Sequence, residues 1–272
     1  MSLAGPGFLR YHPPMPKSSH AVRRADLARW LDHTVEYLDY KRTDGIRSVD
    51  LEPETLAALS APVKPSRFPA AAASGSAVES LQDVEKDIAG CVRCPLHATR
   101  TRAVPGQGNP RAELMFIGEG PGSAEDRSGQ AFVGPAGQLL TRLITRMGFT
   151  RDDVFIANIV KCRPTEDGAG QRDRKPDAAE MRTCLPYLRR QIALIHPRVI
   201  VALGGTAVEG LLGLTGISKL RGRWHEYEGI PLMPTFHPSY LLRGGGDEKE
   251  RYWMVWEDML RVLKKLGRPA PS

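Results

Sequence analysis

Short apolar segments alternate with helical segments from residue 81 onward, and this alternation limits the fold more than any other feature of the chain. Four apolar segments predict β-strands over residues 113–118, 153–160, 198–203 and 230–236. Apolar residues at intervals of three and four predict helices over residues 136–147, 177–195, 206–212 and 247–266. This order of elements favours a three-layer α/β/α sandwich with a central, mainly parallel four-stranded sheet.

The first 80 residues have a different composition. Residues 25–38 predict one amphipathic helix, and residues 52–59 predict a second, shorter one. Residues 61–80 are rich in Pro, Ala and Ser and contain few side chains that could form a core, which is typical of a linker. We therefore expect an accessory helical extension over residues 1–60, a linker over 61–80 and the functional domain over 81–268.

Composition excludes two classes of protein and suggests a partner. Four cysteines in 272 residues are too few for a disulfide scaffold, and no apolar run approaches the about 20 residues needed to cross a bilayer. The N-terminus lacks the apolar stretch of a signal peptide, so we expect a cytosolic protein of bacterial type with no membrane contact. The net charge is +7, of which +6 lies in residues 81–272, and such an excess favours a polyanionic partner.

The four cysteines have a spacing that is typical of a metal site. Cys91 and Cys94 form a CxxC pair at the start of the α/β region, and Cys162 and Cys184 follow at a distance. Thiolates grouped in this way in a reducing compartment hold zinc or an iron-sulfur cluster, and the spacing alone does not choose between the two. The alternative is four unrelated residues, two of them packed as small apolar side chains.

Polar and aromatic residues follow the predicted strands at the edge where α/β proteins bind their ligands. The loop after the first strand carries Glu119, Glu125 and a lone aromatic residue, Phe132, which is either a core side chain or a stacking surface for a planar ligand. Asn158 ends the second strand and is either a turn former or a group that reads the edge of a base. His237 ends the fourth strand, directly before a proline. The loop lacks both the GxGxxG and the Walker patterns, which argues against a nucleoside triphosphate site.

Taken in order, these motifs resemble the uracil-DNA glycosylase superfamily, and most closely its iron-sulfur branch, family 4. The resemblance covers residues 88–263. It rests on Cys91-x-x-Cys94, Gly118-Glu-Gly-Pro-Gly122, Glu125-Asp126, Phe132-Val-Gly134, Asn158-Ile-Val-Lys-Cys-Arg-Pro164, Cys184-x-Pro-Tyr187, Val201-Ala-Leu-Gly204 and His237-Pro-Ser239. The implied fold is that of a uracil-DNA glycosylase.

The resemblance assigns roles to the individual residues. It implies a structural 4Fe-4S cluster on Cys91, Cys94, Cys162 and Cys184. It also implies that Phe132 stacks on uracil, that Asn158 pairs with the polar edge of the base, and that His237 donates to the uracil O2.

The same resemblance places the loop after the first strand in the uracil pocket. Gly118 and Gly120 belong to this pocket, and Gly120 stands where the best-known branch has a carboxylate. Glu119 is therefore our candidate for positioning the attacking water, and Glu125 our candidate for the steric barrier against the methyl group of thymine.

These roles together predict a DNA-repair hydrolase that flips uracil out of DNA, cleaves its N-glycosidic bond and leaves an abasic site. The expected partner is uracil-containing DNA, single- or double-stranded, and the expected state is a monomer. Two basic segments, residues 91–111 and 219–223, are candidates for phosphate contacts. The alternatives are a glycosylase for other deaminated bases, such as hypoxanthine or xanthine, and a non-catalytic iron-sulfur protein that binds DNA.

Overall fold

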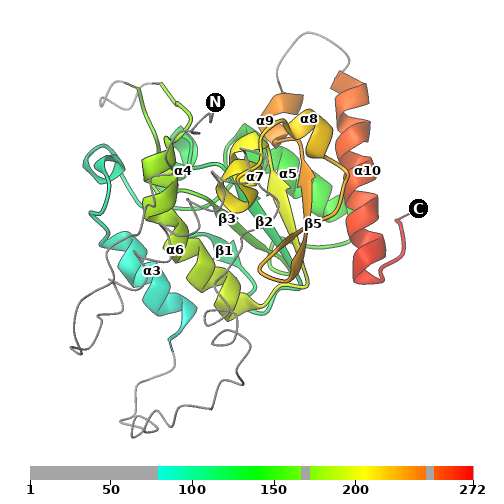
Figure 1. Ribbon diagram of the computed structural model, residues 1–272, viewed down its shortest axis with the longest axis horizontal. Helices are drawn as coiled ribbons and strands as arrows, with labels where there is room; N and C mark the ends of the chain where they lie inside the picture. The colour runs from blue at the N-terminus through cyan, green and yellow to red at the C-terminus, as the bar shows by residue number, and fades with distance from the viewer. Residues whose placement is uncertain (1–78, 167–171, 243–247, 272) are drawn as a thin grey trace, which may run out of the picture. The chain divides into compact units, whose positions relative to one another are not determined.

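A six-stranded sheet forms the centre of the computed structural model, which describes residues 79–166, 172–242 and 248–271 (Figure 1). The strand order is β1-β3-β2-β4-β6-β5. The bounds are Gln107–Gly108 for β1, Leu114–Gly118 for β2, Phe155–Asn158 for β3, Val199–Leu203 for β4, His225–Tyr227 for β5 and Ile230–Thr235 for β6. The inner strands β3, β2, β4 and β6 are parallel, so their carboxyl ends meet at one edge.

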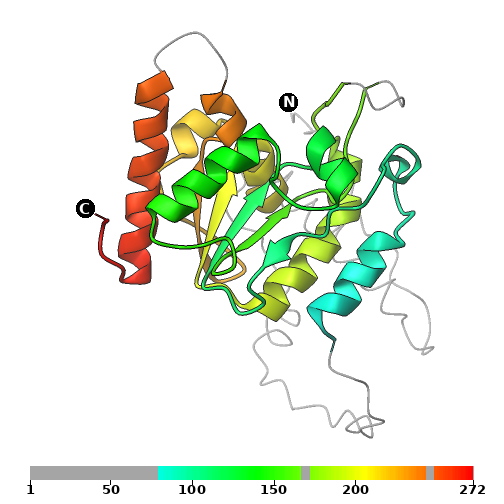
Figure 2. The same cartoon turned by 180° about the vertical axis from the view of Figure 1, so that it is seen from behind.

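Helices cover both faces of this sheet, as the two opposite views show (Figures 1 and 2). The longer ones are α3 (Leu81–Ala89), α5 (Pro135–Arg146), α6 (Ala178–Ile195), α7 (Gly205–Leu212) and α10 (Glu248–Leu266). The short ones are the 3-10 helix η1 (Pro95–Ala98), α4 (Ser123–Ser128), α8 (Ile217–Leu220) and α9 (Pro238–Leu241). Because successive strand residues point to opposite faces, the strands divide their side chains between two cores. In β2, Phe116 packs with α5 and α10, whereas Ile117 packs with α3, α6 and α7.

The predicted α/β class and the four parallel strands are confirmed, but the number of strands was wrong. The strands β1 and β5, which pair antiparallel with β3 and β6, were not predicted. They are only two and three residues long and carry no apolar run, since an edge strand is only partly covered by its neighbours. The strands β1 and β5 are therefore specified by their pairing with β3 and β6, and not by a local sequence pattern.

Capping explains why the helices begin where they do. In α6, the Asp177 side chain accepts from the backbone N–H of Glu180, and the Glu180 carboxylate accepts from the backbone N–H of Asp177. Proline at the first position starts α5. Both beginnings lie within one residue of the sequence prediction.

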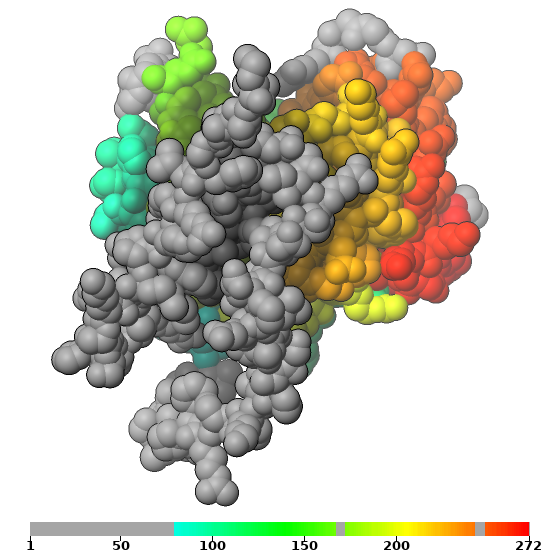
Figure 3. Space-filling model, in the orientation of Figure 1, coloured from blue at the N-terminus to red at the C-terminus, as the bar shows by residue number. Residues whose placement is uncertain are grey.

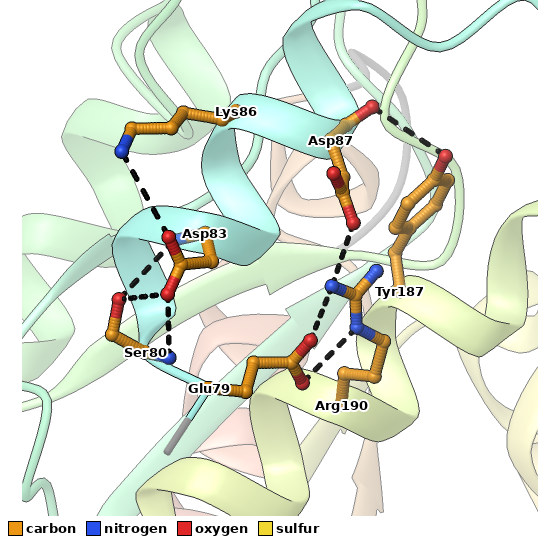
Figure 4. A network of polar contacts seen from close by, with 7 residues as sticks. All are labelled: Glu79, Ser80, Asp83, Lys86, Asp87, Tyr187 and Arg190. Carbon is orange, nitrogen blue, oxygen red and sulfur yellow. Dashed lines mark hydrogen bonds and ion pairs between the residues drawn. The ribbon is translucent and has the colours of Figure 1, made fainter. Parts of the chain in front are cut away.

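A charged network fastens α3 to α6 (Figure 4). The guanidinium of Arg190 on α6 lies 2.6 Å from Glu79 and 2.7 Å from Asp87, and so bridges the segment before α3 and the helix itself. The capping box of α3 is formed by Ser80 and Asp83. The network holds α3 in place directly before the CxxC pair.

The predicted helices at residues 25–38 and 52–59 and all but the last two residues of the predicted linker lie outside the described residues. Within the described part of the chain, all residues belong to one unit, residues 76–272. The helices described there are all too short or too polar to span a membrane.

Candidate active site

A cavity of about 770 Å³ opens at the carboxyl ends of the parallel strands. Its lining includes residues that directly follow or end β2, β3, β4 and β6. Among them are six of the seven side chains or glycines predicted for the pocket: Glu119, Gly120, Glu125, Phe132, Asn158 and His237. The structure thus brings together residues that are up to 118 positions apart in the sequence.

Gly118 contacts the side chains of two of these residues. A Cβ atom at this position would lie 2.5 Å from Asn158 Oδ1 and 2.5 Å from the ring of Phe132. Any side chain here would displace both groups. Gly118 is therefore required by the close approach of the β2 backbone to the pocket side chains.

Phe132 adopts a left-handed backbone conformation, with φ at 53°. Arg151 donates hydrogen bonds to the carbonyl oxygens of Phe132 and Ala131, which holds this strained segment in place. The Phe132 ring lies 5.7 Å from the His237 ring, centroid to centroid. Arg151 was not predicted from the sequence, because nothing near residue 151 indicates that it reaches back to the loop.

Asn158 is buried at the end of β3, with 1% of its surface exposed. Among the described residues, its Oδ1 is one of four buried side-chain atoms without a hydrogen-bond partner. A buried acceptor without a donor costs about 1–3 kcal/mol. The site therefore holds an unsatisfied acceptor that a ligand N–H would satisfy.

His237 is oriented by the residues around it. The backbone N–H of Ser239 donates to His237 Nδ1 at 3.2 Å, and Ser239 Oγ lies 2.8 Å from the same nitrogen. A ring nitrogen that accepts an N–H carries no proton, so the neutral ring carries its proton on Nε2. Gly204, at the end of β4, leaves space for the His237 Cβ, which an added Cβ at residue 204 would approach to 2.9 Å.

Glu119 is hydrogen-bonded through one carboxylate oxygen. Thr206 Oγ1, at the start of α7, donates to Glu119 Oε2 at 2.5 Å. Thr206 was not predicted from the sequence either, because nothing near residue 206 indicates that it reaches the loop after β2. The bond fixes the Glu119 carboxylate in the cavity wall.

Glu125 holds the loop that carries Phe132. Its Oε1 accepts from the backbone N–H groups of Val133 and Gly134 at 2.9 and 2.8 Å, and its Oε2 accepts from that of Gly122 at 3.2 Å. Three backbone donors thus hold this carboxylate in place. Glu125 therefore contributes a fixed volume to the cavity wall, since most of its hydrogen-bonding capacity is used within the loop.

The four cysteines line one small cavity, together with side chains of α3 and α6. Arg100 Nη1 donates to Cys162 Sγ at 3.0 Å, and the backbone N–H of Lys161 donates to Cys184 Sγ at 3.2 Å. Burial raises the pKa of Cys184 to about 12 and also raises the pKa of Cys94 and Cys162.

The four free thiols around this cavity are the donor set of a metal site. In the described part of the chain, no three His, Cys, Asp or Glu side chains converge closely enough for a single metal ion. Zinc needs four sulfurs about 2.3 Å from one point, whereas a four-iron cluster occupies the space between its sulfur ligands. Four cysteines around one cavity supply the donor set of either group, so the residues present fit a four-iron cluster as well as zinc.

Some of the basic residues predicted to contact phosphates contact other groups of the protein instead. Arg100 binds a cysteine sulfur, and Arg93 stacks on the ring of Tyr187 at 5.0 Å. The side chain of Arg221 is 15% exposed and forms an ion pair with the buried Asp258. The sequence showed that these residues are charged, but it did not show which groups their side chains contact.

Comparison with known proteins adds an independent observation. A family model described as the uracil DNA glycosylase superfamily matches residues 105–260. The type-4 uracil-DNA glycosylase of Thermotoga maritima is 43% identical over 195 residues, which cover 70% of this chain and 97% of the relative. The chain belongs to the type-4 branch of the uracil-DNA glycosylase superfamily.

Other relatives place the chain within the superfamily. The type-4 enzyme of Archaeoglobus fulgidus is 40% identical over 61% of this chain and 84% of its own length. The type-5 uracil-DNA glycosylase of Pyrobaculum aerophilum is 28% identical over 62% of this chain and 77% of its own length. The resemblance inferred from the sequence motifs is confirmed.

Proposed function

We propose that this protein excises uracil from DNA by hydrolysing the N-glycosidic bond, as a DNA-repair hydrolase that leaves an abasic site. The observation that carries this function is the unsatisfied Oδ1 of Asn158 beside the Phe132 ring. Uracil offers an N3–H that would satisfy this acceptor. Cytosine has no hydrogen at N3, so it would leave Asn158 unsatisfied, and such a mismatch can discriminate by about 10⁴-fold.

The base must leave the helix before these groups can reach it. Flipping costs a few kcal/mol, and contacts inside the pocket offset this cost. Phe132 supplies a stacking surface, and Asn158 supplies the edge contact. The cavity, at about 770 Å³, also has room for the sugar and for neighbouring parts of the strand.

His237 acts on the leaving group in this scheme. Its Nε2–H would donate to the uracil O2 while the glycosidic bond breaks and negative charge collects on the base. A donor that is already oriented stabilises this charge without reorganisation during the reaction. The backbone N–H of Ser239 donates to His237 Nδ1 and so keeps the ring proton on Nε2, the nitrogen that would donate to the uracil O2.

Glu119 and Glu125 complete the pocket. Thr206 occupies Glu119 Oε2, so we assign the attacking water to Oε1, where the carboxylate also faces the cation-like sugar. Glu125 is the proposed barrier to the thymine methyl group, acting by volume. Its three backbone hydrogen bonds support this assignment because they make the carboxylate rigid.

An alkali cleavage assay tests the function. Purified protein is incubated with an oligonucleotide that contains one uracil, and alkali then cleaves abasic sites. We expect cleavage at the uracil and none at a matched cytosine or thymine. Intact strands with both single- and double-stranded substrates would contradict the proposal, as would full activity in an Asn158→Ala/His237→Ala double variant. A parallel panel with hypoxanthine and xanthine tests the base range.

We further propose that Cys91, Cys94, Cys162 and Cys184 hold a 4Fe-4S cluster. The shared cavity and its four free thiols support it. Cys162 lies four residues after Asn158 and two before Pro164, which lines the active-site cavity. The cluster would thus brace the segment that carries Asn158, and it takes no part in hydrolysis.

The change Cys184→Ala is expected to remove the cluster. The purified variant should lose the visible absorbance of an iron-sulfur protein, and bound iron should fall from about four per chain to near zero. Thr183→Val is the matched control, since Thr183 lines the same cavity and offers no thiolate. A colourless parent protein with stoichiometric zinc would overturn the assignment.

DNA is the partner that the family indicates. The monomeric state, the acceptance of both strand forms and the cytosolic location beside bacterial-type DNA remain proposals. A pocket that takes one flipped nucleotide supports the monomer, because it needs no two-fold symmetry.

A further inference from the structure

Two basic segments that are far apart in the sequence lie side by side on the surface. Lys265 of α10 lies over the ring of Trp224, with its Nζ 5.5 Å from the ring centroid. An added Cβ at Gly222 would come within 2.8 Å of Arg261 Nη1, so the Arg261 guanidinium lies against this turn. We name the surface formed by Lys219, Arg223, Trp224, Arg261 and Lys265 the basic face.

The charges of this basic face point outward. Lys219, Arg223 and Lys265 are exposed, and 48% of the Arg261 side chain and 38% of Trp224 are exposed. Figure 3 shows the described residues before β5 and those of α10 adjoining on one side of the molecule. The acid in contact with this surface, Asp258, is buried beneath it and shared between Arg221 and Arg261.

Helix electrostatics explain only part of this surface. The C-terminal dipole of α10 favours cations in its last turn, which covers Lys265 and its neighbour Lys264. It does not explain Lys219 and Arg223, which belong to other elements. Four exposed acids lie on β5 and α10, but Glu248 and Glu250 belong to the first turn of α10, at the opposite end of that helix from Lys265. The other two, Glu226 and Glu257, are outnumbered by the exposed bases of the basic face. The surface is therefore positive overall and contains one exposed aromatic ring.

The basic face begins at the rim of the active-site cavity. Ile217 and Ser218, in the first turn of α8, line that cavity, and Lys219 is the next residue. At about 1.5 Å of rise per helical residue, Lys219 lies close to the rim. A DNA strand that leaves the cavity across α8 would next meet Arg223 and Trp224.

We propose that the basic face binds the phosphate backbone of DNA beyond the flipped nucleotide, with Trp224 packing against the sugar or an unstacked base. This inference rests on the proposed function. Lysine and arginine gain affinity for DNA by releasing counterions, and aromatic rings add contacts that do not depend on sequence. The basic face would raise affinity for DNA of any sequence and leave the chemistry to the cavity.

Salt dependence of binding tests the proposal. The variant Arg223→Gln/Lys265→Gln removes two cations. The control Lys86→Gln/Arg142→Gln removes two other exposed cations, one on α3 and one on α5, which lie outside both segments predicted to contact phosphates. Dissociation constants are measured against salt for a long undamaged duplex and for a short one limited to the nucleotides around the uracil.

We expect the slope of log K against log salt on the long duplex to fall by about 2 in the Arg223→Gln/Lys265→Gln variant and to stay unchanged in the control, since each lost phosphate contact removes about 0.9. Trp224→Ala should weaken binding to single strands by about fivefold or more at every salt concentration. The excision rate with saturating protein should not change in any of these variants. An unchanged slope, or the same fall in the control, would overturn the proposal. Binding to undamaged DNA is read without catalysis, so a failure here is distinguishable from a failure of the proposed glycosylase activity.

Discussion

His237→Ala is expected to lower the single-turnover rate of uracil excision by about 10²–10³-fold. The change removes the Nε2–H that would donate to the uracil O2 as the glycosidic bond breaks. Asn158 and Phe132 remain, so affinity for uracil-containing DNA should change far less than the rate. The measurement is excision under saturating protein, with binding followed separately.

Ser239→Ala is the matched control for this prediction. It removes the hydroxyl that lies 2.8 Å from His237 Nδ1 but keeps the backbone N–H that fixes the tautomer. We therefore expect a much smaller loss, within about tenfold. A His237→Ala rate within tenfold of the parent would contradict the role of His237. Thermal unfolding of both variants checks that the fold is intact.

Asp258→Ala is expected to lower the free energy of unfolding by about 3–5 kcal/mol. Asp258 is fully buried, and its carboxylate accepts from Thr235 Oγ1 at 2.7 Å and from Arg221 Nη2 at 2.8 Å. Its loss leaves the Arg221 guanidinium without a counter-ion in a site that is 15% exposed. Thr235 ends β6, two residues before His237, so the same change should also reduce excision.

Urea unfolding measures this effect, with Arg261→Gln as the control. Arg261 pairs with the same carboxylate from a half-exposed position, so its loss should cost no more than about 1 kcal/mol. Burial raises the pKa of Asp258, against the hydrogen bonds from Thr235 and Arg221 that lower it. The attraction between Asp258 and Arg221 therefore offsets only part of the free-energy cost of burying both charges. The double change Arg221→Met/Asp258→Leu should lower the free energy of unfolding by less than Asp258→Ala does. Equal losses in the single and double variants would contradict this account.

The parallel strands and the helices that cover them were predictable because each is encoded by a local period. The run from Glu113 to Gly118 is apolar on both sides because the strand is buried on both faces. The edge strand β5 has no such pattern, since it is defined by its pairing with β6. The number of strands therefore could not be read from the sequence.

The pocket residues were predictable for a related reason. Glu119, Asn158 and His237 each stand at or just after a strand end, and parallel strands bring their carboxyl ends to one edge. Their supports were not predictable. Thr206 on Glu119, Arg151 on the Phe132 carbonyl and Asp258 beneath Thr235 all join residues that are far apart in the chain.

The sequence by itself indicated the α/β class, the family and six of the residues that line the cavity. These follow from local periodicity and from motifs that lie within a few residues of each strand end. Only the tertiary structure decided which charges face solvent: Arg221 is buried on Asp258, whereas Arg223 and Lys265 meet on the basic face. The direction of a side chain depends on what packs beside it, and the order of strands and helices in space sets those neighbours.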